Sequence, residues 1–180
     1  MADFSIQEYM NRLGGIPRGS NLEANPQQYI PQGRTVSEFN DPYGDPGRVG
    51  LFSPNTVQMN TAPMERKFAL ETLMHEAAHT TQPAMPHILN GNTNKLRGIE
   101  YGGYLKKGQP TSDVDEVLAD LKAKEALLPK GKSVLDTEHG RTYLDRVRTR
   151  NQMQPTEARD YITNAMYHPH VDMIKKLFSK

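Results

Sequence analysis

The chain has 180 residues, a length that suits one domain with a hydrophobic core and is short for two. Its 22 lysines and arginines nearly balance its 21 aspartates and glutamates, so charge favours neither nucleic acid nor an anionic membrane as the main partner. Cysteine is absent, which excludes disulfides and thiolate metal sites and leaves histidines and carboxylates as the strong metal ligands.

The first residues lack the basic and apolar regions of a secretory signal, and no apolar stretch is long enough to span a bilayer. We therefore expect no membrane partner and no secretion by a signal peptide. The expected location is the cytoplasm, or an assembly formed there such as a virion.

The first sixty residues are expected to form a helix, an irregular arm and edge strands. Residues 3–13 carry apolar side chains at helical spacing and end at two glycines, which is typical of a short helix. Residues 17–47 are rich in proline, glycine, asparagine and glutamine, and this composition predicts a long irregular arm. Residues 48–59 surround a Ser-Pro-Asn turn and predict two short strands or one bent edge strand.

Residues 61–81 give the clearest helix prediction, with Thr61 as N-cap, Pro63 near the first turn and Pro83 after the end. On a helical wheel the leucines of this segment gather on one side, and its two histidines lie on another. One face can therefore pack against the protein while the other binds a ligand.

Three further helices are predicted at residues 112–128, 136–151 and 155–167. The first has a stripe of valines and leucines along one face. A short amphipathic tail is expected at residues 171–178. The chain is thus predicted to be mainly α with a small β component, of the α+β class, with one domain over residues 1–180.

His75 and His79 stand four residues apart, so a helix points both imidazoles the same way at a separation that suits one tetrahedral zinc ion. Glu76 then lies where it can take a proton from a water molecule that zinc activates. This spacing predicts hydrolysis of a peptide bond with zinc as cofactor and Glu76 as general base.

A zinc peptidase needs a third protein ligand, and the candidates are Glu116, Glu100, His87, His168 and His170. Glu116 ranks first because it stands near the start of a predicted helix, with Asp120 one turn later on the same side. Asp120 could then accept the ring N–H of a metal-binding histidine. Glu100 ranks below Glu116, in second place, because it lies among glycines, where no helix is expected to hold it rigidly. The two carboxylates could instead form the solvated acidic edge of a surface helix.

Two short motifs resemble those of the gluzincin class of zinc metallopeptidases: His75-Glu76-Ala77-Ala78-His79 matches HExxH, and Glu116-Val117-Leu118-Ala119-Asp120 matches ExxxD. The resemblance implies a zincin-like fold with a metal helix and a third-ligand helix. It implies that His75, His79 and Glu116 bind zinc, that Glu76 is the general base, and that Asp120 supports a histidine. The interval between His79 and Glu116 is longer than in the best-known members, which leaves the subfamily open.

The leading prediction is therefore a zinc metallopeptidase that acts on a peptide or protein substrate. The alternative is a structural component of a larger assembly, such as a phage virion, that keeps a zinc site with latent or no activity. The predicted arm at residues 17–47 motivates this alternative, because such arms can order on a protein partner. A third hypothesis is an intracellular regulatory peptidase that cuts one specific protein.

Overall fold

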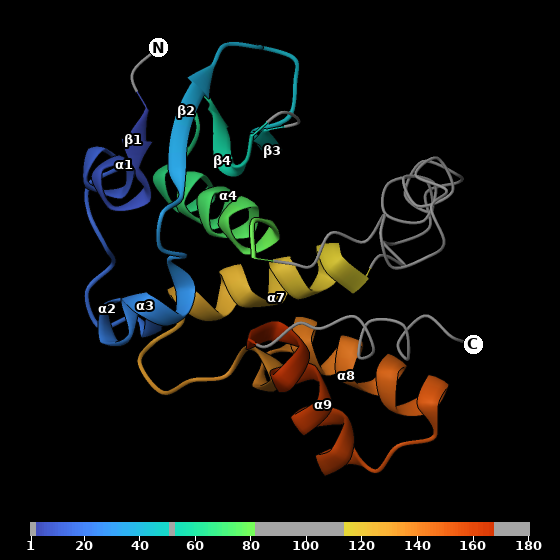
Figure 1. Cartoon of the computed structure of the whole chain (residues 1–180). Helices are drawn as coiled ribbons and strands as arrows, with labels where there is room; N and C mark the ends of the chain where they lie inside the picture. The colour runs from blue at the N-terminus through green and yellow to red at the C-terminus, as the bar shows by residue number, and fades with distance from the viewer. Residues whose placement is uncertain (1–2, 51–52, 82–113, 168–180) are drawn as a thin grey trace. The chain divides into compact units, whose positions relative to one another are not determined.

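In the computed structural model of the chain, the described residues are 3–50, 53–81 and 114–167 (Figure 1). Contacts divide the chain into two compact units, Met1–Thr81 with Lys122–Val134, and Gln82–Leu121 with Leu135–Lys180. Helices and strands occur together, so the predicted α+β class is confirmed. The single domain over residues 1–180 stays a prediction. None of the described helices is long and apolar enough to cross a membrane.

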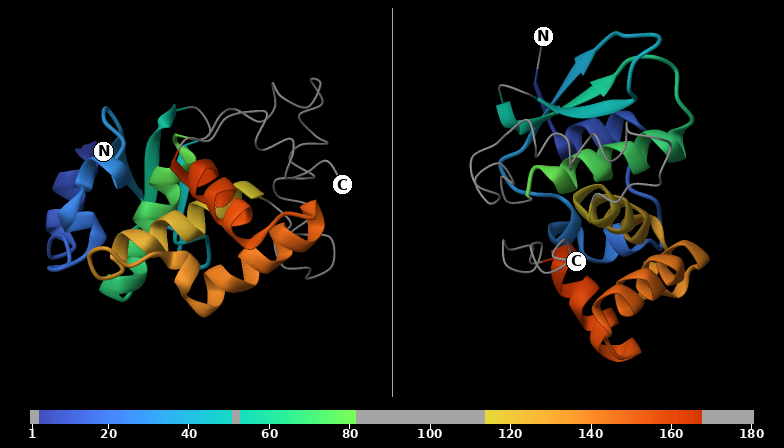
Figure 2. Two further views of the ribbon diagram at one scale, coloured as in Figure 1. Left: turned by 90° about the horizontal axis from the view of Figure 1, so that it is seen from below. Right: turned by 90° about the vertical axis from the view of Figure 1, so that its right-hand side faces the viewer.

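The described residues of the first unit form a mixed sheet whose strand order is β1-β2-β4-β3 (Figure 2). The strands are β1 (Phe4–Ser5), β2 (Thr35–Phe39), β3 (Gly47–Gly50) and β4 (Ser53–Asn60). β1 runs antiparallel to β2, β2 runs parallel to β4, and β3 runs antiparallel to β4. β3 and β4 confirm the alternative of two strands over residues 48–59, but Ser53-Pro54-Asn55, expected as the turn between them, instead forms the start of β4.

The helices of the first unit are α1 (Ile6–Arg12), α2 (Asn21–Ala24), α3 (Pro26–Tyr29), α4 (Arg66–His79) and the second half of α7 (Val114–Leu127). α1 begins at a capping box, in which Ser5 Oγ accepts from the Glu8 N–H and the Ser5 N–H donates to the Glu8 carboxylate. The helix predicted for residues 3–13 is thereby confirmed. The tail predicted at residues 171–178 lies outside the described residues.

Residues 17–47 differ from the irregular arm that their composition suggests, because they contain α2, α3 and β2. Leu22, Tyr29 and Val36 are buried in the core of the first unit. The side-chain amide of Asn21 donates to the carbonyls of Glu125 and Lys132, both at 2.8 Å. A few well-placed apolar residues and one amide are therefore enough to hold a polar segment in place.

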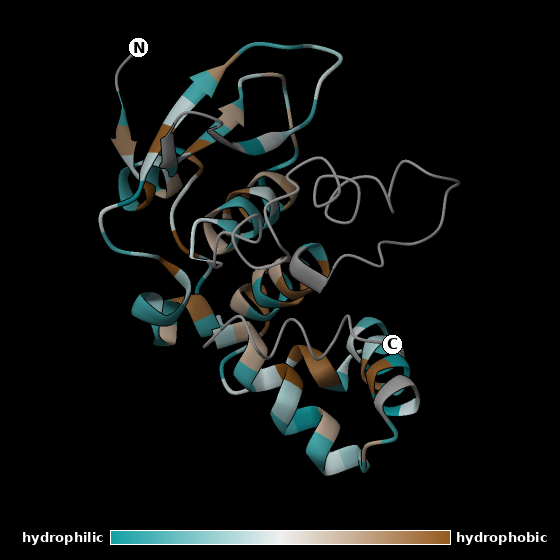
Figure 3. Cartoon of the chain, turned by 45° about the vertical axis from the view of Figure 1, so that its right-hand side comes forward, coloured by the Kyte–Doolittle hydropathy of each residue, from teal (hydrophilic) through white to brown (hydrophobic). Residues whose placement is uncertain are grey.

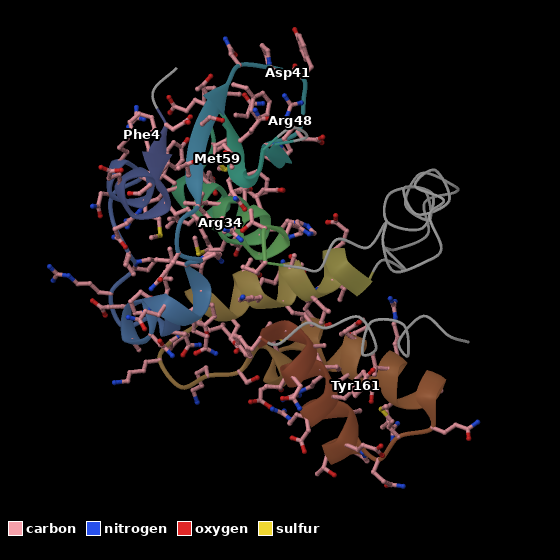
Figure 4. The ribbon with its side chains drawn as sticks, in the orientation of Figure 1. Phe4, Arg34, Asp41, Arg48, Met59 and Tyr161 are labelled. Atoms are coloured by element: carbon pink, nitrogen blue, oxygen red, sulfur yellow. The ribbon has the colours of Figure 1, made fainter. Side chains whose placement is uncertain are left out.

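α4 lies along one face of the sheet, and its buried residues include Leu70, Leu73 and Met74. Met59 of β4 is fully buried where the strand meets this helix (Figure 4). Figure 3 shows apolar and polar residues mixed along the described helices. α4 begins at Arg66 rather than near Thr61, because Thr61 donates through its N–H and its hydroxyl to the Phe39 carbonyl and so prolongs the strands.

In the second unit, α8 (Glu138–Asn151) packs on α9 (Pro155–Tyr167), and both predicted helices are confirmed. Thr137 caps α8 by accepting from the Gly140 N–H at 3.2 Å. Gln152 ends α8 in the left-handed region, with φ of 54°. Val147 and Ile162 are buried, one from each helix. The chain therefore turns back on itself with one helix on each side of Gln152.

The side chain of Asn60 ties the loop after β2 to the end of β4. Its amide nitrogen donates to the carbonyls of Asp41 at 2.6 Å and Asp45 at 3.1 Å. Its amide oxygen accepts from the N–H groups of Asp41 at 3.3 Å and Ala62 at 3.0 Å. Because Asn60 is only 3% exposed, water cannot replace these partners freely.

We expect Asn60→Ala to lower the free energy of unfolding by about 2 kcal/mol, because four part-buried main-chain N–H and C=O groups lose their partner. Urea denaturation followed by circular dichroism measures this change. The control is Asn55→Ala, an exposed residue of the same strand, which should change stability by less than about 0.5 kcal/mol. Equal effects at the two positions would contradict the role given to Asn60.

Candidate metal centre

The last turns of α4 bring two imidazole rings together. His79 Nε2 lies 2.9 Å from His75 Nε2, and the two rings meet edge to face with centroids 4.7 Å apart. Two nitrogens bound to one tetrahedral zinc at 2.0–2.1 Å would be separated by about 3.3 Å. The observed spacing is close to this value, so the pair is already arranged to share one metal ion.

Glu116 provides the third possible ligand, from the helix that both units share. One ligand atom each of His75, His79 and Glu116 lies within 4.8 Å of the others, and all three residues are half-buried. These three residues could therefore hold a metal ion. Two imidazoles and one carboxylate form a donor set of catalytic zinc sites, so the residues present fit that ion.

The other third-ligand candidates lie outside the described residues: Glu100, His87, His168 and His170. Among the described residues, the only group of three or more histidines and carboxylates that could hold a metal ion is the one that contains Glu116. Glu116 thus keeps its first rank among the sequence candidates.

Glu76 follows the first histidine and faces the strand β3. A Cβ atom added to Gly47 would lie 3.1 Å from Glu76 Cγ, 2.7 Å from Thr72 Cγ2 and 3.2 Å from Met59 Sδ. The start of β3 therefore passes over α4 so closely that only a glycine fits there. This contact holds the backbone of an edge strand beside the predicted general base.

The end of α4 is held directly after His79. The hydroxyl of Thr80 donates to the Ala77 carbonyl at 2.7 Å, and that of Thr81 donates to the Ala78 carbonyl at 2.8 Å. Arg34 donates from Nη2 to the Thr80 carbonyl at 3.1 Å, which brings a cation to the negative end of the helix (Figure 4). The hydrogen bonds of Thr80, Thr81 and Arg34 therefore hold the end of the helix next to His79.

Asp120 has His139 of α8 as a partner, with Asp120 Oδ2 and His139 Nε2 2.7 Å apart. The sequence suggested a different role for Asp120, that of accepting the ring N–H of a metal-binding histidine. A carboxylate has two oxygens and can accept from several donors. The support of a metal-binding histidine by Asp120 stays a prediction.

Neither Gly47 nor Arg34 was identified from the sequence. Their contacts join positions far apart in the chain, Gly47 to Thr72 and Arg34 to Thr80. For Gly47 the only local signal was that a glycine precedes an apolar segment. Arg34 had no local signal of its contact with Thr80.

Comparisons of the chain with protein-family models, with curated proteins and with solved structures found no match.

Elemental analysis of the purified protein should find one divalent metal ion per chain. His75→Ala and Glu116→Ala should each lose stoichiometric metal, because each removes one of three donors. Glu138→Ala is the matched control and should keep it, since this glutamate is exposed at the start of α8. Metal retained by Glu116→Ala would move the third ligand to Glu100 or a histidine, and metal retained by His75→Ala would contradict the centre itself.

Gly47→Ala should destabilise the protein by about 1–3 kcal/mol, because its Cβ would meet Thr72 Cγ2 at 2.7 Å. Adding Thr72→Ser removes that methyl group and should recover part of the loss. A double-mutant cycle on the free energy of unfolding should therefore show a coupling of at least about 0.5 kcal/mol. Strictly additive effects would mean that the strand does not approach the helix as described.

Lys122, two turns after Glu116 on α7, is only 8% exposed, and this burial lowers the pKa of its ammonium group from 10.5. As the pH falls below about 10.5, the unfolded chain takes up a proton before the folded chain does. The free energy of unfolding should therefore rise with pH between the lowered folded pKa and about 10.5.

Denaturation curves across this alkaline range should show the rise in the natural sequence and lose it in Lys122→Met. Lys130→Met, at an exposed position, serves as control and should keep the rise. An unchanged pH dependence in Lys122→Met would contradict the assigned cause.

Proposed function

We propose that the chain is a zinc-dependent metallopeptidase. The observation that carries the proposal is the paired Nε2 atoms of His75 and His79 at 2.9 Å, with Glu116 close by and Glu76 in the same helical turn. Helix geometry places Glu76 one position from the first ligand, which is where a general base for an attacking water is needed.

The residues divide the work between binding and proton transfer. His75, His79 and Glu116 hold zinc, which when bound polarises a carbonyl oxygen and lowers the pKa of a water molecule. Glu76 accepts the proton of the attacking water and can pass it to the leaving amine. All three ligands are partly buried rather than fully enclosed, which is compatible with access of a substrate to the proposed centre.

The sheet supports a peptide as the substrate. β3 stands last in the strand order, so among the described residues its outer edge pairs with no strand. An extended peptide can add to such an edge through main-chain hydrogen bonds. Since Gly47 brings the start of this strand to Glu76, a peptide on the edge would pass beside the general base.

The two-helix arrangement agrees with the resemblance to the gluzincin class. α4 carries the HExxH motif, and α7 carries Glu116 and Asp120 of the ExxxD motif. A zincin-like fold, with α4 as metal helix and α7 as third-ligand helix, is part of the proposal. In it Asp120 acts as a positioning residue for a metal-binding histidine.

The alternative, a structural part of a larger assembly such as a virion, stays a prediction. Its motive was an irregular arm at residues 17–47, and these residues are instead folded into the first unit through α2, α3 and β2. The fold of these residues therefore removes the observation that motivated a wrapping role for this segment.

Activity should be assayed on zinc-loaded protein with denatured protein mixtures and quenched fluorescent peptide libraries. Glu76→Gln should reduce cleavage by about a thousandfold, because the amide cannot accept the proton of water. Metal content should stay at one ion per chain, since Glu76 is not a ligand. This combination separates loss of the base from loss of the metal.

Glu71→Gln is the matched control, a half-buried glutamate of the same helix that should leave cleavage unchanged. If Glu76→Gln cleaves the same peptides at the natural rate, the mechanism is wrong. If the zinc-loaded natural protein cleaves nothing in either assay, the latent or structural alternative is favoured instead.

A further inference from the structure

The first unit has a pocket of about 580 Å³ at the end of α4 that lies away from the histidines. Arg66, Lys67 and Leu70, from the first turns of α4, contribute to its lining. His75 stands nine positions after Arg66, which is about 13 Å along the helix axis. The pocket is therefore separate from the candidate metal centre, and its volume lies in the range of small-molecule sites, roughly 300–1,000 Å³.

Three cationic side chains line the pocket, Arg18, Arg66 and Lys67, and no aspartate or glutamate is among its lining residues. All three residues are exposed, and no ion pair with a carboxylate is found for them within the described parts of the chain. Like charges that converge on one cavity repel one another. An anion bound between them relieves that repulsion.

The guanidinium of Arg66 is held in place by the turn after α1. Its Nη2 atom donates to the carbonyls of Gly14 at 2.8 Å and Gly15 at 3.0 Å. Gly14 has φ of 94°, and a Cβ atom there would lie 3.1 Å from Arg66 Nε. Both N–H groups of Arg66 Nη2 are therefore used in bonds that orient the side chain. Its Nε and Nη1 atoms make no hydrogen bond to the described residues.

The rest of the lining is largely apolar: Ile16, Pro17, Leu70 and Leu127. Leu70 is only 2% exposed and belongs to the core, so it forms a fixed floor. A small inorganic anion would leave this apolar surface uncovered. A neutral apolar ligand would leave the three cations without a counter-charge.

We infer that this pocket binds a ligand that carries one carboxylate on an apolar body. The carboxylate lies among Arg66, Lys67 and Arg18, where Arg66 is already oriented to donate. The apolar body covers Leu70 and Leu127 and is removed from water there. Both a free amphiphilic acid and the C-terminus of a peptide that ends in an apolar residue have this chemistry.

Isothermal titration calorimetry with decanoate tests the inference, with decanol and acetate as matched probes. Decanoate should bind with a Kd of about 1 mM or lower, at least about tenfold more tightly than either probe. Acetyl-leucyl-leucine and its amide form a second arm. Binding of the free acid over the amide supports a peptide C-terminus as the source, and binding of decanoate alone supports a free acid.

Arg66→Gln should weaken the binding of the better ligand by about tenfold or more. Lys67→Gln provides a second variant, because the Lys67 side chain makes no hydrogen bond to the described residues, and it should weaken binding by at least about threefold. Arg146→Gln, at an exposed position of α8, is the matched control and should change nothing. The inference is overturned if neither acid shows binding at a ligand concentration of roughly 5 mM, which is 5 times the expected Kd. It is also overturned if decanol binds as tightly as decanoate, or if both pocket variants bind the acid as tightly as the natural sequence does.

Discussion

The close approach of two imidazole rings within one helical turn is the constraint on which the candidate site depends. His75 and His79 have their Nε2 atoms 2.9 Å apart, in a half-buried place where each ring already contacts the other. A helix that frayed at this point would separate them. The first unit prevents fraying, because Thr80 and Thr81 cap the last turn and Arg34 holds the Thr80 carbonyl.

The sheet also contacts the helix near these histidines. Gly47 lets β3 pass within van der Waals distance of Thr72 and Glu76, and Met59 fills the space beneath the strand. Asn60 then fixes the loop that leads into β3 to the end of β4. The strand that could receive a peptide and the helix that could bind a metal ion are therefore positioned by one set of contacts.

Local patterns were enough to predict the helices that contain the site. The spacing of His75, Glu76 and His79 and the apolar stripe of residues 112–128 both depend only on neighbours within a few turns. The predicted start of α4 was about one turn too early. Thr61 donates a hydrogen bond to the carbonyl of Phe39, 22 residues earlier, and this contact keeps it out of the helix.

Contacts over longer separations explain the other differences. Residues 17–47 have the composition of an arm, but Leu22 and Tyr29 find buried positions that the sequence alone does not reveal. Gly47 has no helical or strand pattern that would link it to Glu76. Polar segments with few apolar residues are difficult to interpret for this reason, since one or two tertiary contacts decide whether they fold.

α4 connects two regions of different chemistry. Its last turns carry the two imidazoles that could hold a metal ion together with Glu116 of α7, whereas its first turn carries Arg66 and Lys67, which line a pocket. The core face between them, with Leu70 and Leu73, is buried. One rigid helix thus positions both sets of side chains.

X-ray absorption at the zinc edge of protein loaded with one equivalent of zinc reports the ligands of the metal centre. Binding by His75, His79 and Glu116 predicts two imidazole nitrogens, with their characteristic multiple scattering, and one carboxylate oxygen at about 2.0–2.2 Å. His79→Ala should reduce the imidazole count to one. A zinc shell made of oxygens alone, or one unchanged in His79→Ala, would contradict this ligand set.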